Sequence, residues 1–216
     1  MSFTINDNDR EAFYRVLFSR RDVRSGFLST PIPDEVIERI LLASHHAPSV
    51  GFSQPWDFVL VTDPLAKQAI KEGFDVANAE SAEQFTGERQ AQYRKLKLEG
   101  ILEAPLGICV TCDANRHGPV VLGRTIKPEM DTYSTVCAIQ NMWLAARAEN
   151  IGLGWVSILH DEVLYETLGI PKHLQIIAYL CLGYVSEFKD QPELASADWQ
   201  QREDMQSLIH RDRWQG

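Results

Sequence analysis

The chain has 216 residues, of which 44% are hydrophobic and 24% are charged, and its formal net charge is −9 at pH 7. This composition predicts one globular domain with a full core, and the acidic balance argues against binding to nucleic acid or to an anionic membrane surface. The sequence lacks a run of about 18 uninterrupted apolar residues and a signal-peptide core, so we expect a cytoplasmic protein with no membrane association.

The first part of the chain alternates helical patterns with one strand. In chain order it predicts a helix over 6–19, a helix over 34–46, a loop over 47–56 and a strand over 57–62. Asn6 or Asp7 can cap the first helix, whose apolar residues recur at helical spacing. Pro31 and Pro33 separate the two helices, and proline, glycine and serine mark the loop.

The second part of the chain contains the remaining strands and the most apolar helix. In chain order it predicts helices over 64–79 and 80–98, a strand over 106–111, an irregular loop over 115–128, a helix over 130–150, strands over 152–158 and 175–182, and an extended arm over 184–216. No charge falls between Asp131 and Arg147, so the helix that contains them is expected to be buried on all sides, at a subunit interface. Helices with few strands indicate an α+β fold around a small central sheet.

Three short patterns indicate other chemistry only weakly. Residues 118–125 resemble a phosphate-binding loop, but Arg124 replaces the lysine and Pro128 interrupts the helix that must follow. Cys109 and Cys112 lie in an apolar strand with poorly matched directions, so we predict no metal site. The four cysteines fit a reducing compartment, where they act as small core residues: Cys109, Cys112, Cys137 and Cys181.

Residues 20–24 combine three arginines with one carboxylate, in the order Arg20, Arg21, Asp22, Val23 and Arg24. The planar guanidinium group of arginine suits phosphate oxygens, so the cluster predicts an anion-binding site. The negative charge of Asp22 would weaken anion binding at such a site. Its simplest role is a salt bridge that orients Arg21 or Arg24. In the alternative interpretation the arginines lie on a solvated face and pair with acidic residues of the next helix, Asp34, Glu35 and Glu38.

Four segments carry the most specific patterns: RRDVR at 20–24, APSVGFSQPWDFVLV at 47–61, GRTIKPEMDTYSTVCAIQNMWLAARAE at 123–149 and GLGWVSI at 152–158. Together they resemble the nitroreductase superfamily, which binds flavin mononucleotide (FMN) at a dimer interface. The resemblance implies an α+β nitroreductase-like fold, with a small central mixed sheet flanked by helices, in an intertwined homodimer with a long buried helix. It implies a single domain over 1–216, with the phosphate-binding cluster in 1–30, a lid over 80–99 and a C-terminal arm over 184–216.

The resemblance also implies which residues contact FMN. These are Arg20, Arg21, Asp22, Val23, Arg24, Ser49, Gln54, Leu153, Gly154, Ser157 and Arg202. The arginines are expected to hold the phosphate, because a dianion needs several charge-assisted donors. Ser49 and Gln54 can supply the neutral donors that a ribityl chain and a pyrimidine edge require.

Within the superfamily the chain is similar to the 5,6-dimethylbenzimidazole synthases, which consume the flavin. This branch carries aspartate at the position of Asp22, where ordinary nitroreductases usually carry serine, and it carries a serine that matches Ser157. The resemblance implies that reduced FMN and molecular oxygen are substrates and that dimethylbenzimidazole, the lower ligand of cobalamin, and erythrose 4-phosphate are products. NAD(P)H then acts only indirectly, through a separate flavin reductase.

The resemblance implies two catalytic residues. Asp22 is expected to act as a general base or proton shuttle while the ribityl carbon–nitrogen bond breaks, and Ser157 to bond near flavin N5. Three other functions remain open at this point: an NAD(P)H-dependent nitroreductase or flavin reductase that keeps its FMN, a dehalogenase of the iodotyrosine deiodinase type, and a flavin-binding sensor or storage protein.

Overall fold

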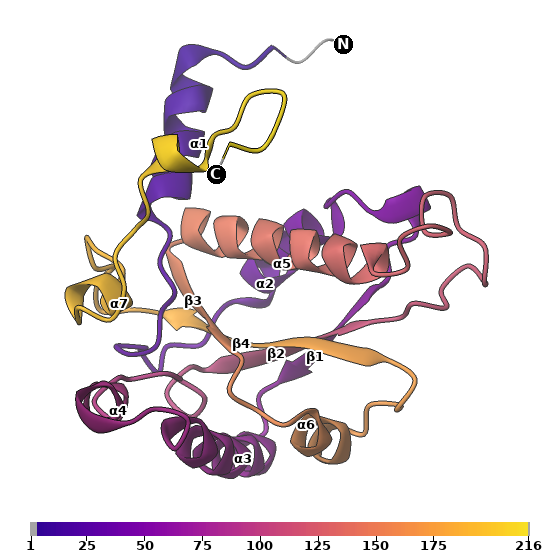
Figure 1. Cartoon of the computed structure of the whole chain (residues 1–216). Helices are drawn as coiled ribbons and strands as arrows, with labels where there is room; N and C mark the ends of the chain where they lie inside the picture. The colour runs from indigo at the N-terminus through magenta and orange to yellow at the C-terminus, as the bar shows by residue number, and fades with distance from the viewer. Residues whose placement is uncertain (1–3, 216) are drawn as a thin grey trace.

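Helices cover both faces of a four-stranded sheet (Figure 1). The computed structural model describes residues 4–215; residues 1–3 and 216, which the predicted domain includes, lie outside the described residues. The strands are β1 (Trp56–Val61), β2 (Leu106–Cys112), β3 (Ile151–Val156) and β4 (Gln175–Tyr184), in the spatial order β1-β2-β4-β3. All three strand pairs are antiparallel, so the sheet is not mixed as expected; a parallel bridge between Asp22 and Leu153 lies outside the named strands.

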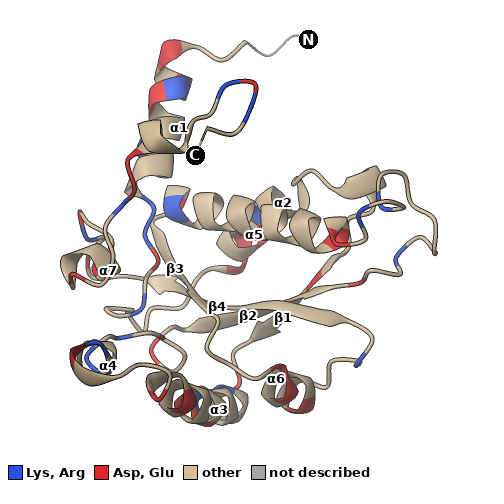
Figure 2. Cartoon of the chain, in the orientation of Figure 1, with Lys and Arg blue, Asp and Glu red and all other residues tan. Residues whose placement is uncertain are grey.

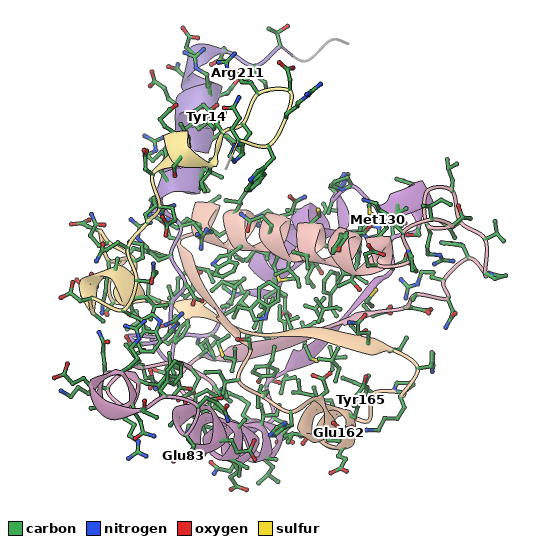
Figure 3. The ribbon with its side chains drawn as sticks, in the orientation of Figure 1. Tyr14, Glu83, Met130, Glu162, Tyr165 and Arg211 are labelled. Atoms are coloured by element: carbon green, nitrogen blue, oxygen red, sulfur yellow. The ribbon has the colours of Figure 1, made fainter. Side chains whose placement is uncertain are left out.

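The helices form two layers and one projecting element. Helices α2 (Asp34–His45) and α5 (Met130–Ala148) lie on one face of the sheet, and α3 (Pro64–Ala82), α4 (Gly87–Tyr93) and α6 (Asp161–Leu168) lie on the other (Figure 1). Helix α1 (Asp7–Ser19) projects beyond α5, and the C-terminal arm, with α7 (Glu193–Ser196) and the 3-10 turn η2 (Met205–Leu208), returns beside it. Side chains fill the space between the sheet and both layers (Figure 3). The predicted α+β architecture is confirmed.

Strand β2 is a short run of apolar residues that is buried on both faces of the sheet. All its residues are buried, because a helix layer covers each face of the sheet. Ile108 and Val110 pack into the core under α2 and α5, whereas the intervening Cys109 packs into the core over α3 and α6. The predicted buried strand over 106–111 is therefore confirmed, and its cysteines serve the packing.

Most predicted helices are present. The first begins after Asn6, whose side chain accepts a hydrogen bond from the Asp9 N–H at 3.1 Å, while the Asp9 carboxylate accepts one from the Asn6 N–H at 3.3 Å. The helices predicted over 34–46, 64–79 and 130–150 are α2, α3 and α5.

The predicted helix over 80–98 is wrong. Helix α3 continues to Ala82, the chain turns over 83–86, and α4 spans only Gly87–Tyr93. Gly87 has a left-handed φ of 58°, and Phe85 stacks on Tyr93 with ring centroids 5.0 Å apart, so the chain folds back on itself. Helix α6 was not predicted, although the left-handed Gly169 after its last residue is a common helix stop.

Helix α5 is covered on one side only in the described part of the chain. Its sheet-facing side chains are buried, among them Ala138, Ile139 and Met142, whereas Tyr133 and Val136 are exposed. Figure 2 shows α5 without charge along its length except at its two ends. Among residues 4–215, no helix combines the length and the apolar character needed to cross a bilayer.

Candidate functional site

Residues 20–24 lie along the outer edge of β3, because glycines there leave room for a second backbone. The Val23 N–H donates a hydrogen bond to the Leu153 carbonyl at 3.0 Å. A Cβ atom on Gly154 would lie 1.9 Å from the Val23 carbonyl oxygen, so only glycine allows this approach. The two segments that the sequence marks as RRDVR and GLGWVS are therefore joined in the structure.

Asp22 is held at the end of β3 by both of its carboxylate oxygens. Oδ1 accepts a hydrogen bond from the Trp155 N–H at 3.0 Å, and Oδ2 accepts one from Arg24 Nε at 2.9 Å. The second nitrogen of the Arg24 fork lies 2.6 Å from Oδ2. This is the salt bridge that the sequence predicts as the simplest role of Asp22, and it compensates the charge of Arg24. Ser157, which is exposed, follows β3 two residues after Trp155.

Arg21 is occupied by backbone carbonyls. Its guanidinium donates to the carbonyls of Phe18 at 2.9 Å, Arg20 at 2.7 Å and Lys189 at 2.9 Å, and also to that of Asp190. These contacts tie the end of α1 to the start of the C-terminal arm. Arg21 therefore builds the surroundings of the cluster and has little donor capacity left for a ligand.

Of the arginines expected to bind the phosphate, Arg20 and Arg202 make no side-chain hydrogen bond and no ion pair within residues 4–215. The Arg20 guanidinium lies over the Trp143 ring, 4.7 Å from its centroid, and makes no side-chain hydrogen bond among the described residues. Burial lowers the pKa of Arg20, and the nearby charges of Arg21 and Arg202 lower it further, whereas Asp22 opposes them. Arg202 lines a cavity of about 450 Å³ together with Phe18, Arg21 and residues of the arm, among them Asp190; Arg20 does not line this cavity. This donor set fits a phosphate group.

The solvated-face alternative for the arginines does not hold in the described part of the chain. Their partners are Asp22 and backbone carbonyls, and no ion pair joins them to the acidic residues of α2. Figure 2 shows blue and red mixed on the segment that leaves α1 for the sheet.

The loop with Ser49 and Gln54 lies at the other end of α5. The Val50 N–H donates to Ser134 Oγ at 3.0 Å, near the helix start, whereas the Trp143 indole donates to the Arg21 carbonyl at 3.0 Å. At 1.5 Å per residue, these two positions on α5 are about 14 Å apart along its axis. In Figure 3, Met130 marks the loop end of α5, and α1 projects beyond the opposite end. Within one chain, residues 20–24 therefore contact β3, whereas Ser49 and Gln54 lie near the opposite end of α5.

Two residues that the sequence analysis did not assign to a site shape this loop. Arg124 and Asp131 form an ion pair at 2.9 Å, with side chains only 7% and 1% exposed. The signal was present in the sequence, because Asp131 is a lone acid at the start of an apolar helix. From the sequence alone, Asp131 marks only the boundary of that helix.

Comparison with known proteins places this geometry in a family. The sequence pattern of the Nitroreductase family matches residues 17–184. The chain is 43% identical over 183 residues to a 5,6-dimethylbenzimidazole synthase of Rhodospirillum rubrum, covering 85% of this chain and 86% of that protein. It is 38% identical to a protein of the same name in Rhodobacter capsulatus, covering 89% of this chain and 92% of that protein.

A solved structure shares the fold. Oxidised iodotyrosine deiodinase bound to FMN and 3-iodo-L-tyrosine superposes with a TM-score of 0.73 at 19% identity, covering 94% of this chain and 99% of that chain. The family pattern spans everything from the end of α1 through β4, including both segments that meet at the sheet edge. With relatives this similar over most of their length, the chain belongs to the nitroreductase family.

Proposed function

We propose that this protein is a 5,6-dimethylbenzimidazole synthase, which fragments reduced FMN with molecular oxygen to dimethylbenzimidazole and erythrose 4-phosphate. The relatives of that name support the proposal over nearly the whole chain. The observation that carries it is the position of the Asp22 carboxylate, which Trp155 and Arg24 fix at the end of β3. Ser157 follows Trp155 by two residues along the chain.

The phosphate of FMN is assigned to Arg20 and Arg202, whose guanidinium donors have no partner among the described residues. Each hydrogen bond from such a group to a charged oxygen contributes about 1.5–3 kcal/mol. Arg21 and Arg24 act indirectly, because Arg21 binds backbone carbonyls and Arg24 binds Asp22. Val23, Leu153 and Gly154 supply the backbone edge along which the flavin lies.

A homodimer completes the site. Ser49 and Gln54 lie far along α5 from residues 20–24 of the same chain, so the loop of one copy is proposed to face the arginines of the other. The exposed Tyr133 and Val136 on α5 support this arrangement, because an uncharged helix face is suited to burial against a second copy. A separate flavin reductase, using NAD(P)H, is proposed to supply the reduced FMN.

Residues 80–99, with α4, are proposed to cover the site. The arm holds α4 in place: Arg89 donates to the Trp199 carbonyl at 2.8 Å and lies 3.4 Å from the Trp199 ring centroid. A covered site excludes water, which protects a reactive flavin from side reactions.

The side chains of this site have distinct tasks. Reduced FMN supplies the electrons and the carbon skeleton of the products. Asp22 accepts a proton on a carboxylate oxygen as the ribityl carbon–nitrogen bond breaks, and such a base contributes about 10²–10⁴-fold in rate. Arg24 and the Trp155 N–H keep that carboxylate in place. The Ser157 hydroxyl donates toward flavin N5.

The fate of the flavin distinguishes this proposal from a nitroreductase or a flavin reductase. The protein is mixed with FMN, NADPH and a nitroaromatic under air, and the flavin is quantified by chromatography after many turnovers of nicotinamide. A retained flavin with rapid nitroaromatic reduction contradicts the proposal. Slow nicotinamide oxidation with loss of flavin supports it, and tight binding with no turnover under oxygen indicates a sensor or storage protein.

A further inference from the structure

Arg116, in the irregular loop 113–129, holds the backbone on both sides of Pro55. Its Nη1 donates to the carbonyls of Gln54 at 2.7 Å and Trp56 at 3.0 Å, while its Nη2 pairs with the Asp57 carboxylate. The Arg116 side chain is 28% exposed, so its charge is only partly removed from water. One guanidinium therefore fixes the exit of the 49–54 loop.

The 49–54 loop needs such support because its backbone is strained. Phe52 and Gln54 have φ angles of 56° and 46°, in the left-handed region that residues with a side chain rarely adopt. Such conformations persist where the surroundings determine them, and they gather at functional sites. Inside the loop, the Gln54 N–H donates to Ser49 Oγ at 3.1 Å.

The same 113–129 loop supports the 49–54 loop at two more points. Arg124 binds Asp131, and the other oxygen of Asp131 accepts a hydrogen bond from Ser53 Oγ at 3.4 Å. A Cβ atom on Gly51 would lie 2.5 Å from Val121 and 2.8 Å from the Leu122 carbonyl, so the two loops are in close contact. Arg124 is buried, and removing one partner of a buried pair destabilises the whole fold. Arg116 is the part of this support that can be changed selectively.

We propose that Arg116 is a positioning residue for FMN, and this inference rests on the proposed function. Arg116 holds the Gln54 carbonyl and Ser49 holds the Gln54 N–H, whereas the Gln54 side-chain amide has no hydrogen bond among the described residues. The backbone is thus fixed from both sides and the amide is left available for the flavin. Without Arg116, Gln54 leaves the left-handed conformation and its amide loses its alignment.

The test measures FMN affinity through the quenching of flavin fluorescence. Arg116→Ala is expected to weaken FMN binding by about tenfold, as for the loss of one well-placed hydrogen bond. Asp57→Asn is the matched control, because it removes the closer ion pair of Arg116 and leaves both carbonyl contacts and the longer pair with Asp113 at 3.9 Å; its affinity is expected within twofold of wild type. Arg116→Lys, with one compact cation in place of the fork, is expected to fall between the two.

A double-mutant cycle separates positioning from general destabilisation. In a Gln54→Ala background, Arg116→Ala is expected to change FMN affinity by less than twofold, because its effect passes through Gln54. An undiminished effect in that background overturns the inference, as does an Asp57→Asn variant that is as weak as Arg116→Ala. Wild-type FMN affinity in both Arg116→Lys and Arg116→Ala also overturns it. A wild-type protein that binds no FMN overturns the proposed function, and the inference with it.

Discussion

Replacing Gly154 by alanine should separate residues 20–24 from the sheet. The added Cβ would lie 1.9 Å from the Val23 carbonyl oxygen and 3.0 Å from its carbon. Both neighbouring atoms belong to the backbone, so no side-chain rotation relieves the clash. The 20–24 segment must move away from β3.

The structure sets the size of the effect. The movement breaks the hydrogen bond from the Val23 N–H to the Leu153 carbonyl, worth about 1 kcal/mol. It also breaks the bond from the Trp155 N–H to the Asp22 carboxylate, worth about 1.5–3 kcal/mol because the acceptor is charged. We expect the free energy of unfolding to fall by about 2.5–4 kcal/mol, a large part of the 5–15 kcal/mol typical of a domain. FMN affinity should fall as well, because Arg20 moves with the segment.

Denaturant unfolding and FMN titration measure both effects, and Gly152→Ala is the matched control. A Cβ on Gly152 would meet only side-chain atoms, at 2.6 Å from Val185 and 3.2 Å from Val23, which can shift. We expect a loss of about 1–2 kcal/mol there, with FMN binding retained. Wild-type stability and FMN affinity in Gly154→Ala, or a larger loss in Gly152→Ala, would refute the close-approach argument.

Arg20, Asp22 and the two buried thiols of the sheet can each be tested by substitution. Arg20→Ala should weaken FMN binding by about 10–100-fold and leave riboflavin binding almost unchanged, because only FMN carries the phosphate; equal losses for both ligands would remove Arg20 from the phosphate site. Asp22→Ala should lower dimethylbenzimidazole formation from supplied reduced FMN by about 10²–10⁴-fold, and a near wild-type rate would show that Asp22 only orients Arg24. Burial raises the pKa of the Cys109 and Cys181 thiols to about 12. Below pH ~8.5 both thiols are protonated in the folded and unfolded states, and above it the unfolded chain releases protons that the folded chain keeps. The free energy of unfolding should therefore fall by about 1.4 kcal/mol per pH unit per thiol as the pH rises toward 12, and an equally steep fall in a Cys109→Ala/Cys181→Ala variant would contradict this.

The sequence predicts which residues belong to the site better than it predicts what each side chain binds. The sequence marks residues 20–24 and the GLGWVS strand as parts of one site by resemblance, and their contact along the edge of β3 comes from the structure. The role of Arg21 depends on carbonyls of Lys189 and Asp190, which the fold brings from far along the chain, so no local pattern reveals it. The break before Gly87 was missed because the charged residues around it have good helix propensity, and tertiary packing of Phe85 overrides that preference.

The side chains that hold the 49–54 loop could also not be predicted from the sequence. Arg116 lies in a stretch without periodicity, and its partners Gln54 and Trp56 are reached only because β1 and β2 pair at their ends, Trp56 opposite Cys112. Arg124 gave a misleading local signal, since it stands in a pattern that resembles a phosphate-binding loop and yet binds Asp131. The partner of a charged side chain in an irregular loop depends on which segments the strand pairing brings close to it.

A 5,6-dimethylbenzimidazole synthase consumes its reduced FMN, and this consumption can be measured directly. The protein with bound FMN is reduced without oxygen, exposed to a pulse of oxygen, and its small-molecule products are separated and identified by mass spectrometry. Dimethylbenzimidazole should form in proportion to the FMN lost. Intact FMN together with hydrogen peroxide would contradict it.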